Sequence, residues 1–153
     1  MIMPEVTVTP FLWFNNNLDE AMVFYQGVFE NATSAVMSRK SDGSAMSASF
    51  TLAGQKFLGL NGGPMFKFNE AVSFFISCET QEDIDHYWDK LLEGGTPSRC
   101  GWLKDKFGLS WQLVPVMLGA VLGHPDPQKA QRAMQAMLTM NKLDIALLKK
   151  SVE

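Results

Sequence analysis

The chain has 153 residues, a length at which one domain buries roughly 70% of its unfolded surface, so it can build a full hydrophobic core. Its net charge of −3 gives no electrostatic basis for binding nucleic acid. No apolar run approaches ~18 residues, no signal-peptide pattern opens the chain, and the two cysteines form no CxxC motif. We therefore expect a cytoplasmic protein that binds neither nucleic acids nor membranes.

The first half of the chain predicts a strand, a helix and three more strands. Residues 6–14 are rich in β-branched and aromatic side chains, which favour a strand. Asn17 can cap the helix that follows, with Glu20 at the capping-box position, and the apolar face of this helix extends to Val28. Strand-like runs separated by turn residues follow at 32–39, 45–53 and 56–61.

The second half predicts the same order of elements. Residues 70–77 are apolar and aromatic, as in a strand. Thr80 can cap a helix over residues 81–93, with Asp83 at the capping-box position. The remaining elements are a short extended piece near residues 97–99 and a β-hairpin over residues 100–115.

The tail of the chain predicts helices. Asp126 can cap a helix over residues 127–140, with Pro127 at its first position, and Asp144 can begin another helix that extends to Lys150. The apolar face of the 127–140 helix is expected to cover a sheet surface or a partner subunit.

The two halves form an internal repeat. A shift of 63 residues places Asn17 on Thr80 and Tyr25 on Trp88, so that helix caps and aromatic pairs coincide. We therefore predict a single α+β domain, residues 1–153, built from tandem βαβββ modules. Its parts are module one at about residues 6–61, a linker at 62–69, module two at about 70–115, and C-terminal helices at about 116–150.

Three sequence segments carry a resemblance to a known family. They are Pro-Phe-Leu-Trp-Phe at residues 10–14, Phe-Leu-Gly-Leu-Asn-Gly-Gly-Pro at 57–64, and Cys-Gly-Trp-Leu-Lys-Asp-Lys-Phe-Gly-Leu-Ser-Trp-Gln at 100–112. Over about residues 7–149, the chain resembles the PhnB-like branch of the vicinal oxygen chelate superfamily, which includes glyoxalase I, extradiol dioxygenases and antibiotic-resistance proteins. The resemblance implies a U-shaped mixed sheet of the glyoxalase/bleomycin-resistance type. It also implies a homodimer, in which the linker can let two chains exchange modules.

The resemblance also implies where a metal ion would bind. Enzymes of the superfamily fill three or four positions on the first and last strands of the modules with His, Glu or Gln. In this chain these positions fall at Thr9 or Pro10, at Leu58, near Ser73 and at Gln112. Only Gln112 has the side chain of a metal ligand, and one amide beside a hydroxyl and an aliphatic group does not hold a divalent ion. We expect no metal and no other cofactor.

The same frame of modules predicts a small-molecule pocket. Alternation along the strands places every second side chain on the concave face of the sheet, where aromatic rings gather with a few hydroxyls and one amide. These side chains could instead fill the concavity as core, with Gln112 hydrogen-bonded to Ser73. We favour the pocket, and the candidate ligand-binding residues are Trp13, Ser73, Phe75, Trp102 and Gln112.

Other side chains have weaker functional interpretations. Cys100 follows Arg99, whose guanidinium could stabilise a thiolate, but a free cysteine is more often a small buried residue. His86 and His124 lack a partner that would orient them as a base or ligand. The charged run at residues 104–106 is expected to form a solvated turn.

These features favour a metal-free homodimer that binds an unidentified small molecule in an aromatic pocket. One alternative is a glyoxalase-like metal-dependent lyase or isomerase, or a resistance enzyme, and another is a structural or interaction homodimer. No set of side chains identifies a catalytic centre, so the sequence leaves open whether the protein is an enzyme.

Some family members are named demethylubiquinone methyltransferases. That activity is not supported here, because a nucleoside-binding site is not visible in the sequence. No Gly-rich loop follows a strand, and no acidic residue on the next strand could hold the nucleoside.

Overall fold

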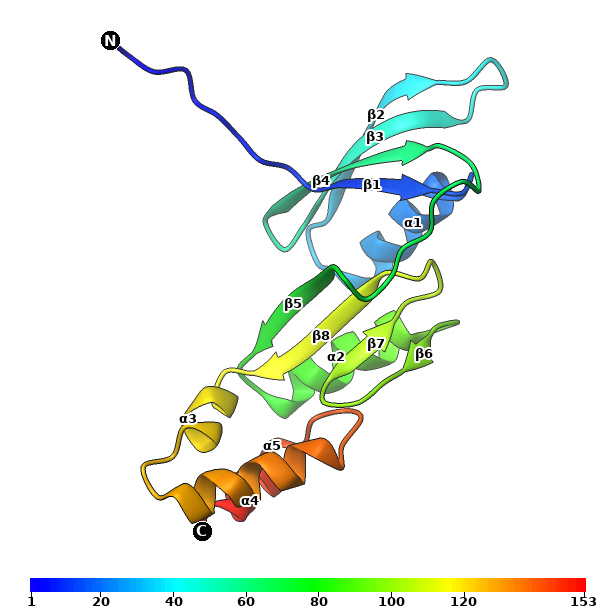
Figure 1. Cartoon of the computed structure of the whole chain (residues 1–153). Coiled ribbons are helices and arrows are strands. Elements are labelled where there is room, and N and C mark those ends of the chain that lie inside the picture. The colour runs from blue at the N-terminus through cyan, green and yellow to red at the C-terminus, as the bar shows by residue number, and fades with distance from the viewer. The chain divides into compact units, whose positions relative to one another are not determined.

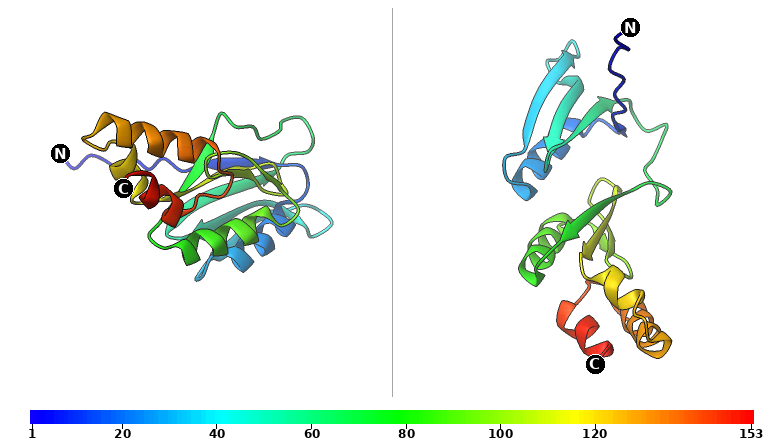
Figure 2. Two further views of the ribbon diagram at one scale, coloured as in Figure 1. Left: turned by 90° about the horizontal axis from the view of Figure 1, so that it is seen from below. Right: turned by 90° about the vertical axis from the view of Figure 1, so that its left-hand side faces the viewer.

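The computed structural model describes all 153 residues and divides the chain into two units, Met1–Lys67 and Phe68–Glu153 (Figure 1). Each unit contains a four-stranded mixed sheet and a helix in the predicted βαβββ order, and the second unit ends in three more helices. The predicted α+β fold class, with tandem modules and C-terminal helices, is confirmed. In Figure 2 the helix of each module lies along one face of its own sheet. None of the helices combines the length and the apolar character that crossing a bilayer requires.

The first module has the strand order β1-β4-β3-β2, with α1 (Leu18–Val28) packed on one face. Strand β1 (Phe11–Phe14) runs parallel to β4 (Gln55–Asn61), and β3 (Ala45–Leu52) lies antiparallel to both β4 and β2 (Thr33–Arg39). Phe14, Tyr25 and Phe50 are among the buried side chains of this module, and the rings of Tyr25 and Phe50 stack with centroids 6.1 Å apart. Because side chains alternate along a strand, the opposite face of the sheet keeps its side chains outside this core.

Strand β1 is shorter than the strand predicted at residues 6–14. Residues 1–10 have no secondary structure, and Val6 and Val8 are 84% and 94% exposed. The last bond at this end joins the Leu58 N–H to the Pro10 carbonyl at 2.9 Å. Proline has no N–H, so Pro10 cannot continue the ladder as a donor. The β-rich composition of residues 6–9 therefore did not find a partner strand within the module.

The start of α1 is capped from a distant strand. The N–H of Leu18 donates to Oδ1 of Asn61 at 2.9 Å, and Nδ2 of Asn61 donates to the Ala45 carbonyl at 2.8 Å. The side chain of Asn17 makes no capping bond, and its Oδ1 is buried without a partner. The prediction that Asn17 caps the helix through its side chain is therefore wrong. A long-range amide satisfies the free N–H in its place.

The second module has the strand order β5-β8-β7-β6 and the helix α2 (Gln81–Leu92). The predicted cap of α2 is confirmed, since Oγ1 of Thr80 accepts from the Asp83 N–H at 3.1 Å. Its strands are β5 (Ser73–Cys78), β6 (Thr96–Pro97), β7 (Trp102–Lys104) and β8 (Ser110–Pro115). Strands β5 and β8 are parallel, whereas β8 and β7 form the predicted antiparallel hairpin.

Three helices follow β8, namely α3 (Leu118–Leu122), α4 (Pro127–Leu138) and α5 (Ile145–Ser151). The predicted caps are present, because Asp126 accepts from the Gln128 N–H and Asp144 accepts from the Leu147 N–H, both at 2.9 Å. Buried Met140, Leu143 and Leu148 form a small core of their own, against which Met117, Leu118, Ala136 and Met137 pack.

Polar bonds attach these helices to the second module. The N–H groups of Cys100 and Gly101 donate to the carbonyls of Met140 and Asn141 at 2.8 and 2.7 Å. The Gln81 side chain, in the first turn of α2, donates to the Leu143 carbonyl at 3.1 Å and accepts from the Ile145 N–H at 2.9 Å. The helices therefore have a fixed place beside the hairpin of module two.

We predict that Asn61→Ala lowers the free energy of unfolding by about 2–4 kcal/mol, because it leaves the Leu18 N–H and the Ala45 carbonyl buried without partners. Chemical denaturation checks the value. The matched control is Asn17→Ala, which removes an amide that makes no bond and should change stability by less than about 1 kcal/mol. Equal losses in the two variants would contradict the long-range cap.

Candidate functional site

The hairpin of β7 and β8 is organised by the carboxylate of Asp105, which is 3% exposed. Oδ1 accepts from the N–H groups of Phe107 and Leu109 at 2.9 and 3.1 Å, and Oδ2 accepts from Nε1 of Trp111 at 3.0 Å. Lys106 is exposed, as predicted, but the expectation that Asp105 is solvated is wrong. A buried carboxylate is stable here because three N–H groups replace its water.

The bond to Asp105 fixes the orientation of strand β8. Trp111 and Leu113 are buried on the face that packs with α2, so Gln112 must point to the opposite face. On that face Gln112 stands opposite Phe75 in the β5·β8 register and opposite Trp102 in the β7·β8 register. The hairpin thus brings three of the predicted site residues side by side.

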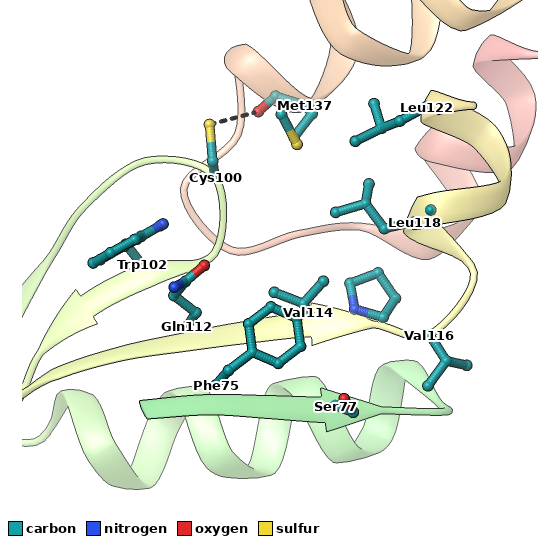
Figure 3. Close-up of a pocket in the computed structure, with 12 residues that line it drawn as sticks. Phe75, Ser77, Cys100, Trp102, Gln112, Val114, Val116, Leu118, Leu122 and Met137 are labelled. Carbon is teal, nitrogen blue, oxygen red and sulfur yellow. Dashed lines mark hydrogen bonds between the residues drawn. The ribbon is translucent and has the colours of Figure 1, made fainter. Parts of the chain in front are cut away.

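A cavity of about 520 Å³ opens over this face of the second module (Figure 3). Strands β5, β7 and β8 form one wall, and the chain after β8 forms the other with α3 and α4. The lining residues are Phe75, Ser77, Cys100, Trp102, Gln112, Val114, Pro115, Val116, Leu118, Gly119, Leu122 and Met137. None of these side chains is an acid, a base of the Lys or Arg type, or a histidine.

Gln112 is bonded on one side and free on the other. Its Nε2 donates to Oγ of Ser73 at 2.9 Å, which is the bond considered from the sequence. Its Oε1 has no hydrogen-bond partner in the chain, and neither has Nε1 of Trp102. The hydrogen bond to Ser73 and the open cavity therefore exist together.

The predicted site residues do not all line this cavity. Phe75, Trp102 and Gln112 line it. Ser73 does not line the cavity but is hydrogen-bonded to Gln112. Trp13 belongs to the first unit, where its Nε1 donates to the Gly63 carbonyl at 3.0 Å. Its ring lies so close to Gly62 that a Cβ at that residue would stand 2.3 Å from it, so only glycine fits there.

The sequence interpretation missed the helical wall of the cavity. Leu118 and Leu122 come from α3, which the sequence did not predict. Met137 comes from α4, whose apolar face was expected to cover a sheet or a partner subunit. The amphipathic pattern of α4 indicated that this side chain is covered, but it carried no information on which surface it faces.

The residues of the second module do not fit a divalent metal ion. The two implied ligand positions in this module, Ser73 and Gln112, are bonded to each other. No group of three His, Cys, Asp or Glu side chains stands close enough to hold an ion. His86 packs edge-on against Tyr87 with ring centroids 4.9 Å apart, and Nδ1 of His124 accepts from the Asp126 N–H at 3.0 Å. Neither histidine lines the cavity.

The two cysteines stand in different surroundings. Cys78 is 2% exposed, and burial, with a smaller contribution from Asp83, raises the pKa of its thiol to about 11. Cys100 is half-buried in the cavity wall, and its Sγ donates to the Met137 carbonyl at 3.7 Å (Figure 3). Of the two thiols, only Cys100 is open to a molecule in the cavity.

Comparison with known proteins gives a consistent family and fold. A sequence model of the family described as 3-demethylubiquinone-9 3-methyltransferase matches residues 6–114. A structure of a PhnB protein from Bacillus cereus is 33% identical, with a TM-score of 0.67, and the match covers 72% of this chain and all of that one. Comparison with curated proteins gives no match.

More distant structures share the fold alone. The fosfomycin resistance protein FosX from Listeria monocytogenes, in complex with Mn(II) and sulfate, is 18% identical with a TM-score of 0.55, over 72% of this chain and 92% of that one. A protein from Pseudomonas aeruginosa is 17% identical with a TM-score of 0.60, over 72% of this chain and 98% of that one. The family match ends at residue 114, before the helices that form one wall of the cavity.

We predict that Asp105→Ala lowers the free energy of unfolding by about 3 kcal/mol, because three N–H groups, two of them buried, lose their acceptor. Thermal and chemical denaturation measure the loss. Lys106→Ala, at the exposed neighbour, should stay within about 0.5 kcal/mol of the wild type. A small effect of Asp105→Ala would show that the hairpin does not depend on this carboxylate.

Iodoacetamide is expected to modify Cys100 but not Cys78 in the native protein near neutral pH, because a buried neutral thiol is a poor nucleophile. Mass spectrometry of tryptic peptides gives the modified site. Cys100→Ser should abolish native labelling, and Cys78→Ser should leave it unchanged. Rapid native labelling of Cys78 would contradict its burial.

Proposed function

The chain belongs to the PhnB-like family of the vicinal oxygen chelate superfamily, and we propose that it binds a small organic molecule, without a metal ion, in the cavity of its second module. The observation that carries the proposal is the cavity of about 520 Å³, which has a mostly apolar lining and a few polar groups. Ligand sites in proteins have volumes of roughly 300–1,000 Å³, and they too are lined mainly by apolar side chains with a few polar groups.

The donor set supports metal-free binding. A divalent ion needs several carboxylate, imidazole or thiolate ligands, and the ligand positions of module two offer one amide and one hydroxyl that are already bonded to each other. The FosX structure contains Mn(II), but at 18% identity the similarity between FosX and this chain shows the fold only. The chemistry of the bound ion therefore does not transfer to this chain.

We do not propose a methyltransferase activity, although the matching family model is described as a methyltransferase. A nucleoside cofactor of the dinucleotide type needs a Gly-rich turn between a strand and a helix. The turns that precede α1 and α2 are Asn15-Asn16-Asn17 and Glu79-Thr80, and neither contains glycine. The cavity also holds no carboxylate or imidazole that could act as a general acid or base.

The proposal extends to assembly and location. We propose a homodimer whose linker, residues 62–69, can let the two chains exchange modules. The exposure of Phe11 and Phe66, at 56% and 57%, supports an apolar contact surface. The two cysteines are free, which suits the reducing cytoplasm.

Binding of the neutral dye Nile red, followed by its fluorescence, tests the proposal. We expect saturable binding that EDTA does not change. Leu122→Trp should weaken it at least about tenfold, because the larger ring occupies the cavity. The matched control Leu138→Trp places the same ring on α4 at a residue that is 44% exposed and outside the lining.

Two outcomes of this experiment would count against the proposal. Equal binding of Nile red by both tryptophan variants would show that the dye binds outside this cavity. Binding that EDTA abolishes would favour a metal-dependent protein.

A further inference from the structure

The cavity of the second module contains no fixed charge. Its twelve lining residues include no Asp, Glu, Lys, Arg or His. An ion transferred from water into such a site loses its hydration and gains no opposite charge. Aromatic faces can attract a cation, but Phe75 is 59% exposed and stands apart from Trp102, with Gln112 between their strands. The lining therefore favours an uncharged ligand.

Two free hydrogen-bonding groups of the cavity, on Gln112 and Trp102, lie at one end. Because Nε2 of Gln112 donates to Ser73, the atom left for a ligand is the acceptor Oε1. The indole Nε1–H of Trp102 is a donor without a partner. Gln112 and Trp102 are register partners on β8 and β7, and Figure 3 shows both side chains at the same end of the cavity. One acceptor and one donor thus stand side by side.

The rest of the cavity is apolar. Val114 and Phe75 form its floor, and Leu118, Leu122 and Met137 face the sheet from the C-terminal helices (Figure 3). Ser77 carries the one side-chain hydroxyl of the lining, and this residue is exposed to solvent. A polar end and an apolar body give the cavity a direction, with the head of a ligand at Gln112 and its body beneath α3 and α4.

We infer that the ligand is an uncharged, largely apolar molecule with one head group that both accepts and donates a hydrogen bond, such as a hydroxyl or a primary amide. The head group accepts from Nε1 of Trp102 and donates to Oε1 of Gln112. Ser73 is a positioning residue, because its bond to Nε2 keeps Oε1 turned to the ligand. This inference rests on the proposed function and adds the chemical class of the ligand.

A matched series of naphthalene compounds tests the inference through displacement of Nile red. The series is 1-naphthylmethanol, 1-methylnaphthalene, 1-naphthylmethylammonium and 1-naphthoate. We expect the alcohol to bind most tightly, about four- to a hundredfold better than 1-methylnaphthalene, because each of the two net hydrogen bonds contributes about two- to tenfold. Both ions should bind more weakly than 1-methylnaphthalene, since neither finds an opposite charge.

Two variants assign the effect to the named atoms. Gln112→Leu removes the acceptor at similar volume, and Trp102→Phe removes the donor while it keeps an aromatic ring. Each should lower the ratio of the affinities for the alcohol and for 1-methylnaphthalene, both measured against the variant's own affinity for Nile red. Circular dichroism and thermal unfolding confirm that each variant is folded, and the two variants test the same head group independently.

The outcomes separate this inference from the proposed function. If Nile red does not bind the wild type, the proposed function itself fails. If Nile red binds but 1-naphthoate or the ammonium competes as well as the alcohol, the cavity is a binding site and the inferred ligand class is wrong. A preference for the alcohol that survives both variants would also overturn the inference, because the head group would then bind elsewhere.

Discussion

The bond network of the Asp105 carboxylate is the interaction on which the second module depends. It closes the turn between β7 and β8 through two backbone N–H groups and holds the Trp111 indole through a third donor. Because alternate side chains of a strand point to opposite faces, fixing Trp111 toward α2 fixes Gln112 toward the cavity. A buried carboxylate in a turn therefore decides which side chain of β8 faces the cavity.

Local sequence patterns predicted the modules well, and contacts distant in sequence account for the differences. Helix caps and apolar periodicity located α2, α4 and the hairpin, because these signals act within a few residues. They failed at α1, where Asn61 from β4 supplies the cap that the pattern assigned to Asn17. They also failed at Asp105, because a charged run gives no sign that three N–H groups converge on one of its members.

The candidate site was predictable where it depends on strand alternation. The alternation of side chains along β5, β7 and β8 places Phe75, Trp102 and Gln112 on one face of the sheet. In the structure these three residues lie in one wall of the cavity. The opposite wall could not be predicted in the same way, since an amphipathic helix shows which of its faces is covered but not by what. Trp13 illustrates the limit of the repeat, because its packing on Gly62 and its bond to Gly63 have no signature in the strand pattern.

We propose that Gln112 faces a small molecule and not a metal ion. The metal content per chain, measured by plasma mass spectrometry on protein purified without chelator and without a metal-affinity step, tests this proposal. We expect no stoichiometric manganese, iron, nickel or zinc in the wild type and no change on Gln112→Ala. One equivalent of a divalent ion that disappears in Gln112→Ala would contradict it and would return the chain to the metal chemistry of its superfamily.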